Sequence, residues 1–114
     1  MISHIVLSPD AEDDIIEIYR SGIANFGIGQ ADAYEAMLRH SVKIELAFHP
    51  FIGIARPELG HDIRALYRGA HHIYYRVEGD TLTIIRIVSG RMNVEQDDLY
   101  SVLQKLRRIG PAQD

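Results

Sequence analysis

Hydrophobic positions in the first half of the chain recur with a helical period. A short apolar run over residues 2–7 ends at Ser8-Pro9-Asp10, where Ser8 is expected to cap a helix and Pro9 to take its first position. Apolar side chains then recur at intervals of three and four, and they predict one helix up to residues 22–29 and a second from Gln30 to about Phe48. Two helices with so short a link form an antiparallel hairpin.

The second half of the chain changes to an alternating pattern. A connecting loop is expected over residues 50–60, followed by strands over residues 62–68, 70–78 and 81–88. A two-residue turn at Gly79-Asp80 sets the pairing of the last two strands. The expected cross-strand pairs are Val77 with Leu82, Arg76 with Thr83, Tyr75 with Ile84 and Tyr74 with Ile85. The last strand is apolar on both faces, so we expect it inside the sheet.

A final amphipathic helix is predicted from Val94 to Ile109, with Asn93 and Gln96 as its capping box and Gly110-Pro111 as its stop. The order βααβββ plus a C-terminal helix predicts an α+β fold, with the helices packed on one face of a small, mostly antiparallel sheet. We expect a single domain over residues 1–114. Its core lies within residues 1–99, and residues 100–114 form the rest of the last helix and a tail.

The composition is that of an ordinary globular protein, because 46% of the 114 residues are hydrophobic and 25% are charged. The absence of cysteine excludes disulfide bonds, thiolate nucleophiles and cysteine-based zinc sites. No apolar run reaches the length of a membrane span, roughly 18 residues. These features predict a cytoplasmic protein without membrane association.

Charge is unevenly distributed along the chain. The formal net charge of −4 argues against a dedicated nucleic-acid-binding protein. Residues 1–50 carry three basic and eight acidic side chains, whereas residues 51–91 carry six arginines against four acidic side chains. Since arginine is suited to bidentate recognition of carboxylates and phosphates, we expect a partner to bind this second stretch. Arg86 lies mid-strand among apolar residues and is expected to be paired, whereas Arg64 and Arg91, near strand ends, are expected to be solvated.

The six histidines do not predict a metal site. His71 and His72 are neighbours in a strand, so their side chains point to opposite faces and cannot share one ion. The other histidines lack nearby ligands at a suitable spacing. No metal or other cofactor is expected.

Several short motifs follow one another in a characteristic order. They are Tyr34, Arg56 with Glu58-Leu59-Gly60, Ile63-Arg64, His72-Ile73-Tyr74-Tyr75-Arg76-Val77, Arg86-Ile87-Val88 and Arg91-Met92. From about Ile5 to Leu99 the chain resembles the ParE branch of the RelE/ParE toxin superfamily. The resemblance implies the same βααβββ layout and a toxin of a type II toxin-antitoxin system, of the kind linked to plasmid stabilisation. It also implies a cognate antitoxin whose extended C-terminal segment holds the toxin inactive.

The same resemblance leaves three functions open. ParE members poison DNA gyrase, RelE-like relatives cut messenger RNA on the ribosome, and a degenerate member would only bind its antitoxin. Where many members have a histidine, this chain has Ser89, and Ser89-Gly90 offers no group that titrates near neutral pH. We therefore expect a gyrase inhibitor with no catalytic residues. A ribosome-dependent mRNA endonuclease is the first alternative.

Two sets of residues are expected to bind partners. Contact with the target, without direct sequence-specific binding of nucleic acid, is assigned to Arg64, His72, Tyr74, Arg86 and Arg91. Contact with the antitoxin is assigned to Ile15, Ile18, Tyr19, Met37 and Leu38, which together with Ile44 exceed what so thin a sheet is expected to bury. An extended antitoxin segment is expected to add to an open sheet edge, or a short helix to lie in the groove beside it.

Overall fold

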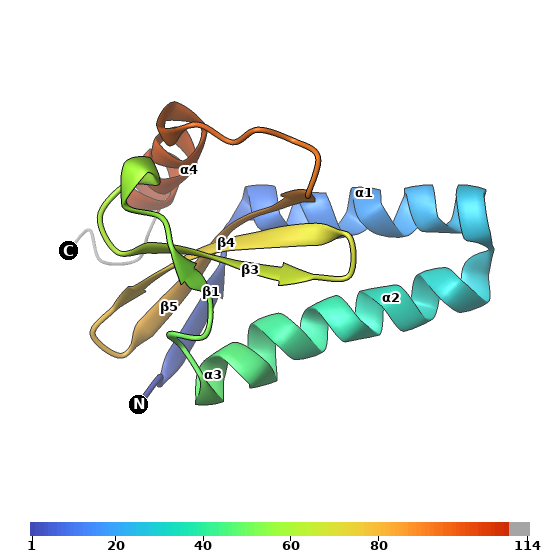
Figure 1. Cartoon of the computed structure of the whole chain (residues 1–114), viewed down its shortest axis with the longest axis horizontal. Helices are drawn as coiled ribbons and strands as arrows, with labels where there is room; N and C mark the ends of the chain where they lie inside the picture. The colour runs from blue at the N-terminus through green and yellow to red at the C-terminus, as the bar shows by residue number, and fades with distance from the viewer. Residues whose placement is uncertain (110–114) are drawn as a thin grey trace.

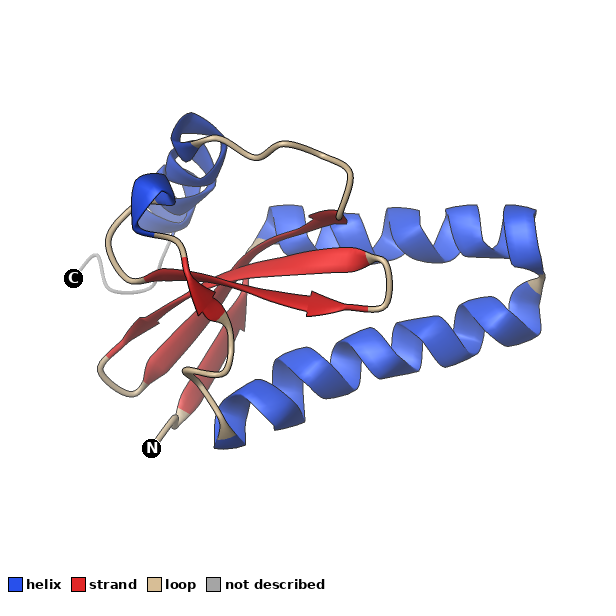
Figure 2. Cartoon of the chain, in the orientation of Figure 1, coloured by secondary structure: helices blue, strands red, loops and turns tan. Residues whose placement is uncertain are grey.

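Five strands form one sheet, and a long helix hairpin lies against it (Figure 1, Figure 2). The computed structural model describes residues 1–109. Along the chain the elements are β1 (His4–Leu7), α1 (Pro9–Phe26), α2 (Ile28–His40), a π-helical turn (Ser41–Glu45), α3 (Leu46–Phe48), β2 (Ile54–Ala55), a 3-10 turn (Pro57–Leu59), β3 (Ile63–Arg68), β4 (His71–Glu78), β5 (Thr81–Ser89) and α4 (Gln96–Ile109). The strand order is β1-β5-β4-β3-β2, with β1 parallel to β5 and the other neighbours antiparallel. This arrangement confirms the predicted α+β fold.

The first helix starts as predicted and runs further than predicted. The hydroxyl of Ser8 accepts a hydrogen bond from the amide of Ala11 at 2.9 Å, and Pro9 is the first helical residue. The break between the two helices was expected over residues 22–29, and in the structure it consists of Gly27 alone. Gly22 stays helical and lies where α1 and α2 approach closely, since a Cβ on it would be 3.2 Å from the Cβ of Ala31. The predicted second helix is confirmed, although a π-helical turn interrupts it.

The pairing of β4 with β5 follows the predicted register up to a bulge. Val77 pairs with Leu82 and Tyr75 with Ile84, as the turn at Gly79-Asp80 implies. Tyr74, however, pairs with Arg86 and not with Ile85. The prediction for this pair was wrong because Ile85 is an extra residue on β5, and its carbonyl accepts a hydrogen bond from the Ser8 hydroxyl at 2.7 Å.

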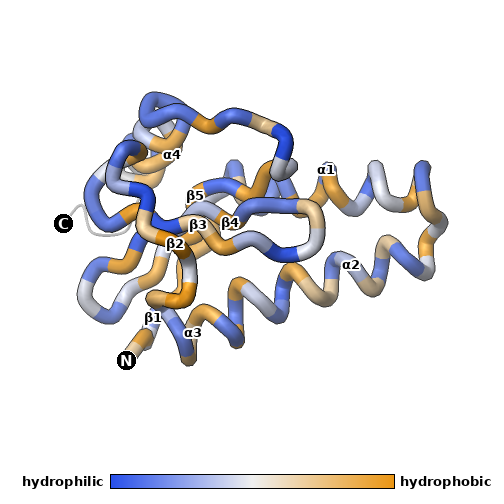
Figure 3. Tube along the Cα trace, viewed as in Figure 1, coloured by the Kyte–Doolittle hydropathy of each residue, from blue (hydrophilic) through white to orange (hydrophobic). Residues whose placement is uncertain are grey.

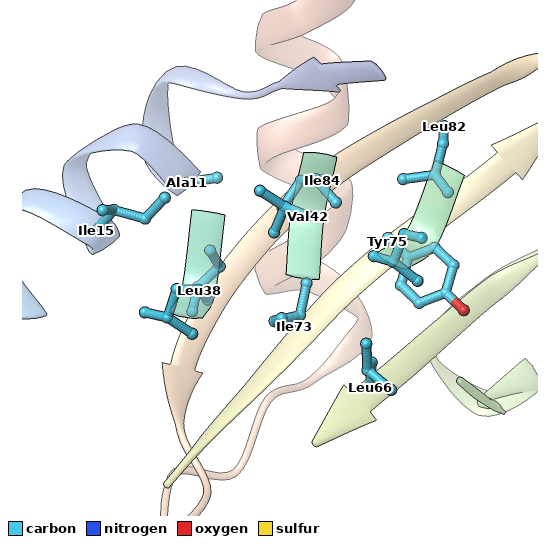
Figure 4. Close-up of a cluster of buried hydrophobic side chains, with 11 residues drawn as sticks. Ala11, Ile15, Leu38, Val42, Leu66, Ile73, Tyr75, Leu82 and Ile84 are labelled. Carbon is cyan, nitrogen blue, oxygen red and sulfur yellow. The ribbon is translucent and has the colours of Figure 1, made fainter. Parts of the chain in front are cut away.

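Apolar side chains cover both faces of the sheet, so the expectation of helices on one face only was wrong. On the hairpin side Ile15, Leu38 and Val42 pack against Ile73 and Ile84, as Figure 4 shows. A second cluster on the opposite face consists of Leu59, Ile63, Ala65, Tyr74, Ile85, Val88, Leu99 and Val102. Because β5 carries apolar residues on both sides, as expected of an interior strand, each face needs its own cover. The cover of the second face comes from α4 and the 3-10 turn.

Two local features differ from the sequence prediction. The loop expected over residues 50–60 contains the short edge strand β2. The last helix begins at Gln96, because the amide of Glu95 donates to the Asp98 carboxylate at 2.9 Å; the capping box of Asn93 and Gln96 was wrong. The predicted stop at Gly110-Pro111 lies outside the described residues. Among the described helices, none is long and apolar enough to cross a membrane.

Ser8 joins the start of α1 to the bulge in β5, so its removal should destabilise the fold. We expect Ser8→Ala to lower the free energy of unfolding by about 2 kcal/mol, because both a helix cap and the bond to a buried carbonyl are lost. Ser21→Ala, at an exposed position of the same helix, is the matched control, and its effect should stay within about 0.5 kcal/mol. Urea denaturation measures both. Equal midpoints for the two variants would contradict this role of Ser8.

Candidate functional site

The arginines of residues 51–91 are mostly held by partners within the protein. Arg56 pairs with Glu58, Arg68 with Glu45, Arg76 with Glu78 and Arg86 with Asp14. Arg64 instead donates to backbone carbonyls. Arg91 is exposed, and its guanidinium forms no hydrogen bond or ion pair with residues 1–106, whose side chains the structure describes. Of the six arginines in residues 51–91, five are therefore held by other groups of the protein, and Arg91 has no partner among the described side chains.

Arg86 makes the most extensive of these ion pairs. Its Nε and one terminal nitrogen donate to the two carboxylate oxygens of Asp14 at 2.7 and 2.9 Å. The same carboxylate accepts the amide of Ile87 at 2.8 Å. The hydrogen bonding of Arg86 to the Asp14 carboxylate is the main cause that raises the pKa of the Arg86 guanidinium. The expectation that Arg86 has a partner is confirmed, and the partner lies on α1.

Arg64 has a different environment from the one expected. Its guanidinium donates to the carbonyls of Gly53 at 2.8 Å and Phe51 at 3.3 Å, and it lies 5.1 Å from the centre of the Phe51 ring. The side chain therefore holds the loop that leads into β2. The expectation of a freely solvated strand-end charge was wrong, because this loop folds back over the start of β3.

His72 and Tyr74 lie together on the second face of the sheet. The His72 ring lies between Tyr67, at 4.7 Å between ring centres, and Tyr74, at 5.8 Å. Tyr74 is only 2% exposed, and the guanidinium of Arg56 lies 6.0 Å from its ring centre. Burial, and secondarily the charge of Arg56, lowers the pKa of His72, whose Nδ1 is buried without a hydrogen-bond partner among the described residues.

The side chain of His71 lies on the hairpin side of the sheet, whereas that of His72 lies on the opposite face. The Tyr34 hydroxyl accepts the amide of Ala70 at 2.9 Å and forms a hydrogen bond of 2.6 Å with Nδ1 of His71. Burial lowers the pKa of His71, which favours the neutral imidazole. Gly69 makes the contact possible, since it has a φ of +58° and a Cβ there would lie 2.6 Å from the Tyr34 hydroxyl.

The five residues assigned to target contact do not form a single site. His72, Tyr74 and Arg86 lie close together through their strand pairing, since Tyr74 is the partner of Arg86. Arg64, at the start of β3, and Arg91, after the end of β5, lie at opposite ends of the sheet. No group of three or more potential metal-ligating side chains occurs among residues 1–109.

The sequence analysis did not place His71 and His72 beside the end of β5, where the structure has them. The strand pairing places His71 opposite Ser89 and His72 opposite Val88. Counting back from the turn at Gly79-Asp80 brings these residues within one position of that register. The end of β5 is therefore closer to titratable groups than Ser89-Gly90 alone indicated.

The residues assigned to antitoxin contact divide into core and surface. Ile15 and Leu38 are fully buried in the hairpin-side cluster and belong to the core. Ile18, Tyr19 and Met37 are half-buried and Ile44 is exposed. The expectation that the sheet would not bury all six side chains therefore agrees with the structure.

Exposed apolar side chains gather around the open edge of the sheet. We call them the β2-edge patch: Ile44, Phe48, Phe51, Ile52 and Ile54, of which Ile54 is 74% exposed. In Figure 3 the trace leading into β2 is strongly hydrophobic. β2 pairs only with β3, which leaves its other edge open. Such a patch on a sheet edge marks an interaction surface.

Comparison with known proteins identifies the class of this fold. A chromosomal ParDE toxin-antitoxin system from P. aeruginosa aligns with a TM-score of 0.56 and 19% identity, over 77% of this chain and 96% of that chain. The toxin-antitoxin complex RelBE2 from Mycobacterium tuberculosis aligns with a TM-score of 0.60 and 17% identity, over 78% of this chain and 99% of that chain. The helix hairpin on a five-stranded sheet is thus the fold of RelE/ParE-type toxins.

Sequence comparison assigns the family within that class. The family model for the ParE toxin of type II toxin-antitoxin system, parDE, matches residues 5–94. Toxin ParE1 of Mycobacterium tuberculosis, in the CDC 1551 / Oshkosh and H37Rv strains, is 34% identical over 98 residues, which cover 85% of this chain and 99% of that protein. The chain belongs to the ParE family of type II toxin-antitoxin toxins, as its motifs indicated.

Loss of the Arg86 side chain should destabilise the protein far more than loss of Arg91. Arg86→Ala leaves the Asp14 carboxylate, which is only 15% exposed, without its counter-ion, and we expect a loss of about 2 kcal/mol. Arg91→Ala should change stability by no more than about 0.5 kcal/mol, because its side chain is exposed. Thermal and urea unfolding measure both variants. Similar melting temperatures for the two would show that the ion pair adds little.

Stability should fall on mild acidification because of His71 and His72. Both pKa values are lowered by burial, so the unfolded chain binds more protons and stability is lost as pH falls from the unfolded value, about 6.5, toward the folded values. We expect His71→Gln and His72→Gln each to reduce the difference in urea midpoint between pH 7.5 and 5.5. His61→Gln, at a side chain that is 88% exposed, is the control. A pH dependence that none of the variants reduces would contradict this assignment.

Proposed function

We propose that the chain inhibits DNA gyrase by protein contact and is neutralised by a cognate antitoxin. Membership of the ParE family supports this function. The observation that carries it is the chemistry at the end of β5, where Ser89-Gly90 cannot move a proton and Arg91 stays protonated. The free guanidinium of Arg91 is the part of the target-contact set best placed to meet a carboxylate of the target.

His71 adds to the argument against general acid-base chemistry. Its Nδ1 is hydrogen-bonded to the Tyr34 hydroxyl at 2.6 Å, and that nitrogen is therefore occupied. Most of the other arginines around the strand ends are neutralised by a carboxylate of the protein. A scissile phosphate would have to displace these carboxylates before it gained stabilisation from Arg56, Arg68 or Arg86.

One observation favours the mRNA endonuclease as the second candidate. Nδ1 of His72 is buried without a partner among the described residues, and its ring contacts Tyr67 close to the end of β5. A neutral imidazole with an open nitrogen is able to act as a general base. The hollow beside it, lined by Arg56, Arg68 and His72, is large enough for a phosphate.

Two assays on the purified chain separate the candidates. In the first, gyrase supercoils relaxed plasmid in the presence of the chain, and we expect supercoiling to stall or cleaved DNA to accumulate. In the second, ribosome-bound message is incubated with the chain, and we expect no cleavage above background. Message cuts that disappear in His72→Gln would establish the endonuclease instead. Failure in both assays, with the antitoxin still bound, would identify a degenerate member.

The proposed antitoxin site is the β2-edge patch together with the half-buried side of α2. Met37, Ile44 and Phe48 line one hollow on α2, the π-helical turn and α3, which also includes Arg68 of β3. An extended segment added along the free edge of β2 would gain backbone hydrogen bonds and bury the exposed rings and aliphatic chains. Arg56 and Arg68 lie in the hollow on the other side of β2, which favours an acidic segment.

Introducing a charge into this patch should weaken the antitoxin complex without unfolding the toxin. We expect Ile54→Asp to reduce affinity for the antitoxin at least about tenfold, since an apolar anchor is lost and a carboxylate is buried on binding. Met92→Asp, at a residue that is also exposed but lies away from the edge strand, should bind normally. Calorimetric titration with the purified antitoxin measures both. Unchanged affinity of Ile54→Asp would place the antitoxin elsewhere.

A further inference from the structure

A second hollow lies between the two helices of the hairpin, away from the β2-edge patch. We call it the hairpin pocket; it has a volume of about 350 Å³, and its lining includes Glu17, Tyr19, Phe26, Tyr34 and Glu35. Figure 1 shows the turn between β3 and β4 pointing into the V formed by α1 and α2. The volume lies in the range of small-molecule sites, roughly 300–1,000 Å³.

The pocket is lined by both helices and by the turn between β3 and β4. Gly22 and Ala31, where the helices are in contact, are part of its lining. Toward the sheet, the Tyr34 hydroxyl is bonded to the amide of Ala70 and to His71, which fixes the turn against α2. Phe26 and Gln30 continue the lining toward the tip of the hairpin, and apolar groups form most of it.

The chemistry of the lining favours a positive charge on an apolar body. Three aromatic side chains, Tyr19, Phe26 and Tyr34, line the hollow, and the faces of such rings attract cations. The charged groups of the lining are Glu17 and Glu35, with no lysine or arginine among them. A hydrogen bond between Tyr19 and Asp32, 2.6 Å long, brings a further carboxylate to the rim.

The two glutamates of the lining differ in their availability. Glu35 already shares a contact of 3.3 Å with Arg39. Glu17 is exposed and forms no ion pair within the described part of the chain. His71 at the closed end is kept neutral by burial, which lowers its pKa, and it therefore adds no positive charge at neutral pH. Glu17 is thus the counter-charge that a cationic ligand would meet.

We propose that the hairpin pocket binds a small organic cation, an ammonium group on an apolar body. The apolar body lies between α1 and α2 against the aromatic rings, and the ammonium group faces Glu17. Anions are excluded by the same carboxylates. The pocket shares no lining residue with the β2-edge patch.

Three probes of similar shape test the proposal on the full chain. Phenethylamine is a cation at pH 7, 2-phenylethanol is neutral and 3-phenylpropionate is an anion. In NMR titrations we expect saturable shifts with phenethylamine at residues 17–35 and 69–71, binding of the alcohol about threefold to fivefold weaker, and no binding of the anion. Shifts that do not saturate, that map elsewhere, or that are equally strong for the alcohol would overturn the proposal.

Variants with matched controls separate a local site from the general charge of the protein. Glu17→Gln should weaken phenethylamine about threefold to fivefold and leave the alcohol unchanged, whereas Glu95→Gln, an equal change at an exposed residue before α4, should alter neither. Ser21→Trp should fill the pocket and abolish binding; Ala24→Trp, exposed on the same helix but outside the lining, should not. Equal effects within either pair would contradict the site, and melting curves confirm that each variant is folded.

Discussion

Asp14 connects the first helix to β5 where the backbone of that strand extends past the end of β1. β1 ends at Leu7, opposite Ile84, so the edge of β5 beyond that point has no backbone partner. The Ser8 hydroxyl donates a hydrogen bond to the carbonyl of Ile85. The Asp14 carboxylate accepts a hydrogen bond from the amide of Ile87 and also forms the ion pair with Arg86. Side chains of α1 thereby continue the ladder after β1 stops. The direction in which α1 leaves the sheet depends on these contacts, and so does the hairpin that follows.

The bulge at Ile85 explains why both faces of the sheet need helices. An inserted residue turns the strand, and Ile85 itself joins the second cluster while its neighbours Ile84 and Ile87 stay in the first. The helical periods, the turn and most of the strand pairs could be predicted because each depends on neighbouring residues. The bulge could not, since counting from a turn assumes one residue opposite one. The packing of α4 could not be predicted either, because the apolar stripe of a helix does not indicate which face of the sheet the helix will cover.

In the candidate site, too, features set by neighbouring residues could be predicted from the sequence, whereas contacts between distant residues could not. The place of Arg86 inside a strand predicts a partner, but that partner lies 72 residues away and nothing in the pattern points to it. The sequence predicts a solvated Arg64, but in the structure its guanidinium donates to two carbonyls of the loop before β2. Ile15 and Leu38 were assigned to antitoxin contact because a helical apolar stripe does not show which of its residues the sheet will bury. β2, with two residues inside a loop, carries no periodic signal at all.

The distribution of ion pairs bears on how a partner could bind. The guanidinium groups beside the open edge, Arg56 and Arg68, are already paired with Glu58 and Glu45, and the bond from Arg68 is the main cause that lowers the pKa of Glu45. An acidic segment arriving at β2 must compete with these carboxylates, so its charge would mainly steer the encounter. The free energy of the proposed complex would then come from covering Phe51, Ile54 and their exposed neighbours and from the unpaired backbone of the edge. Such a surface selects a partner by its apolar spacing and its ability to extend, and it leaves the acidic hairpin free for ligands of opposite charge.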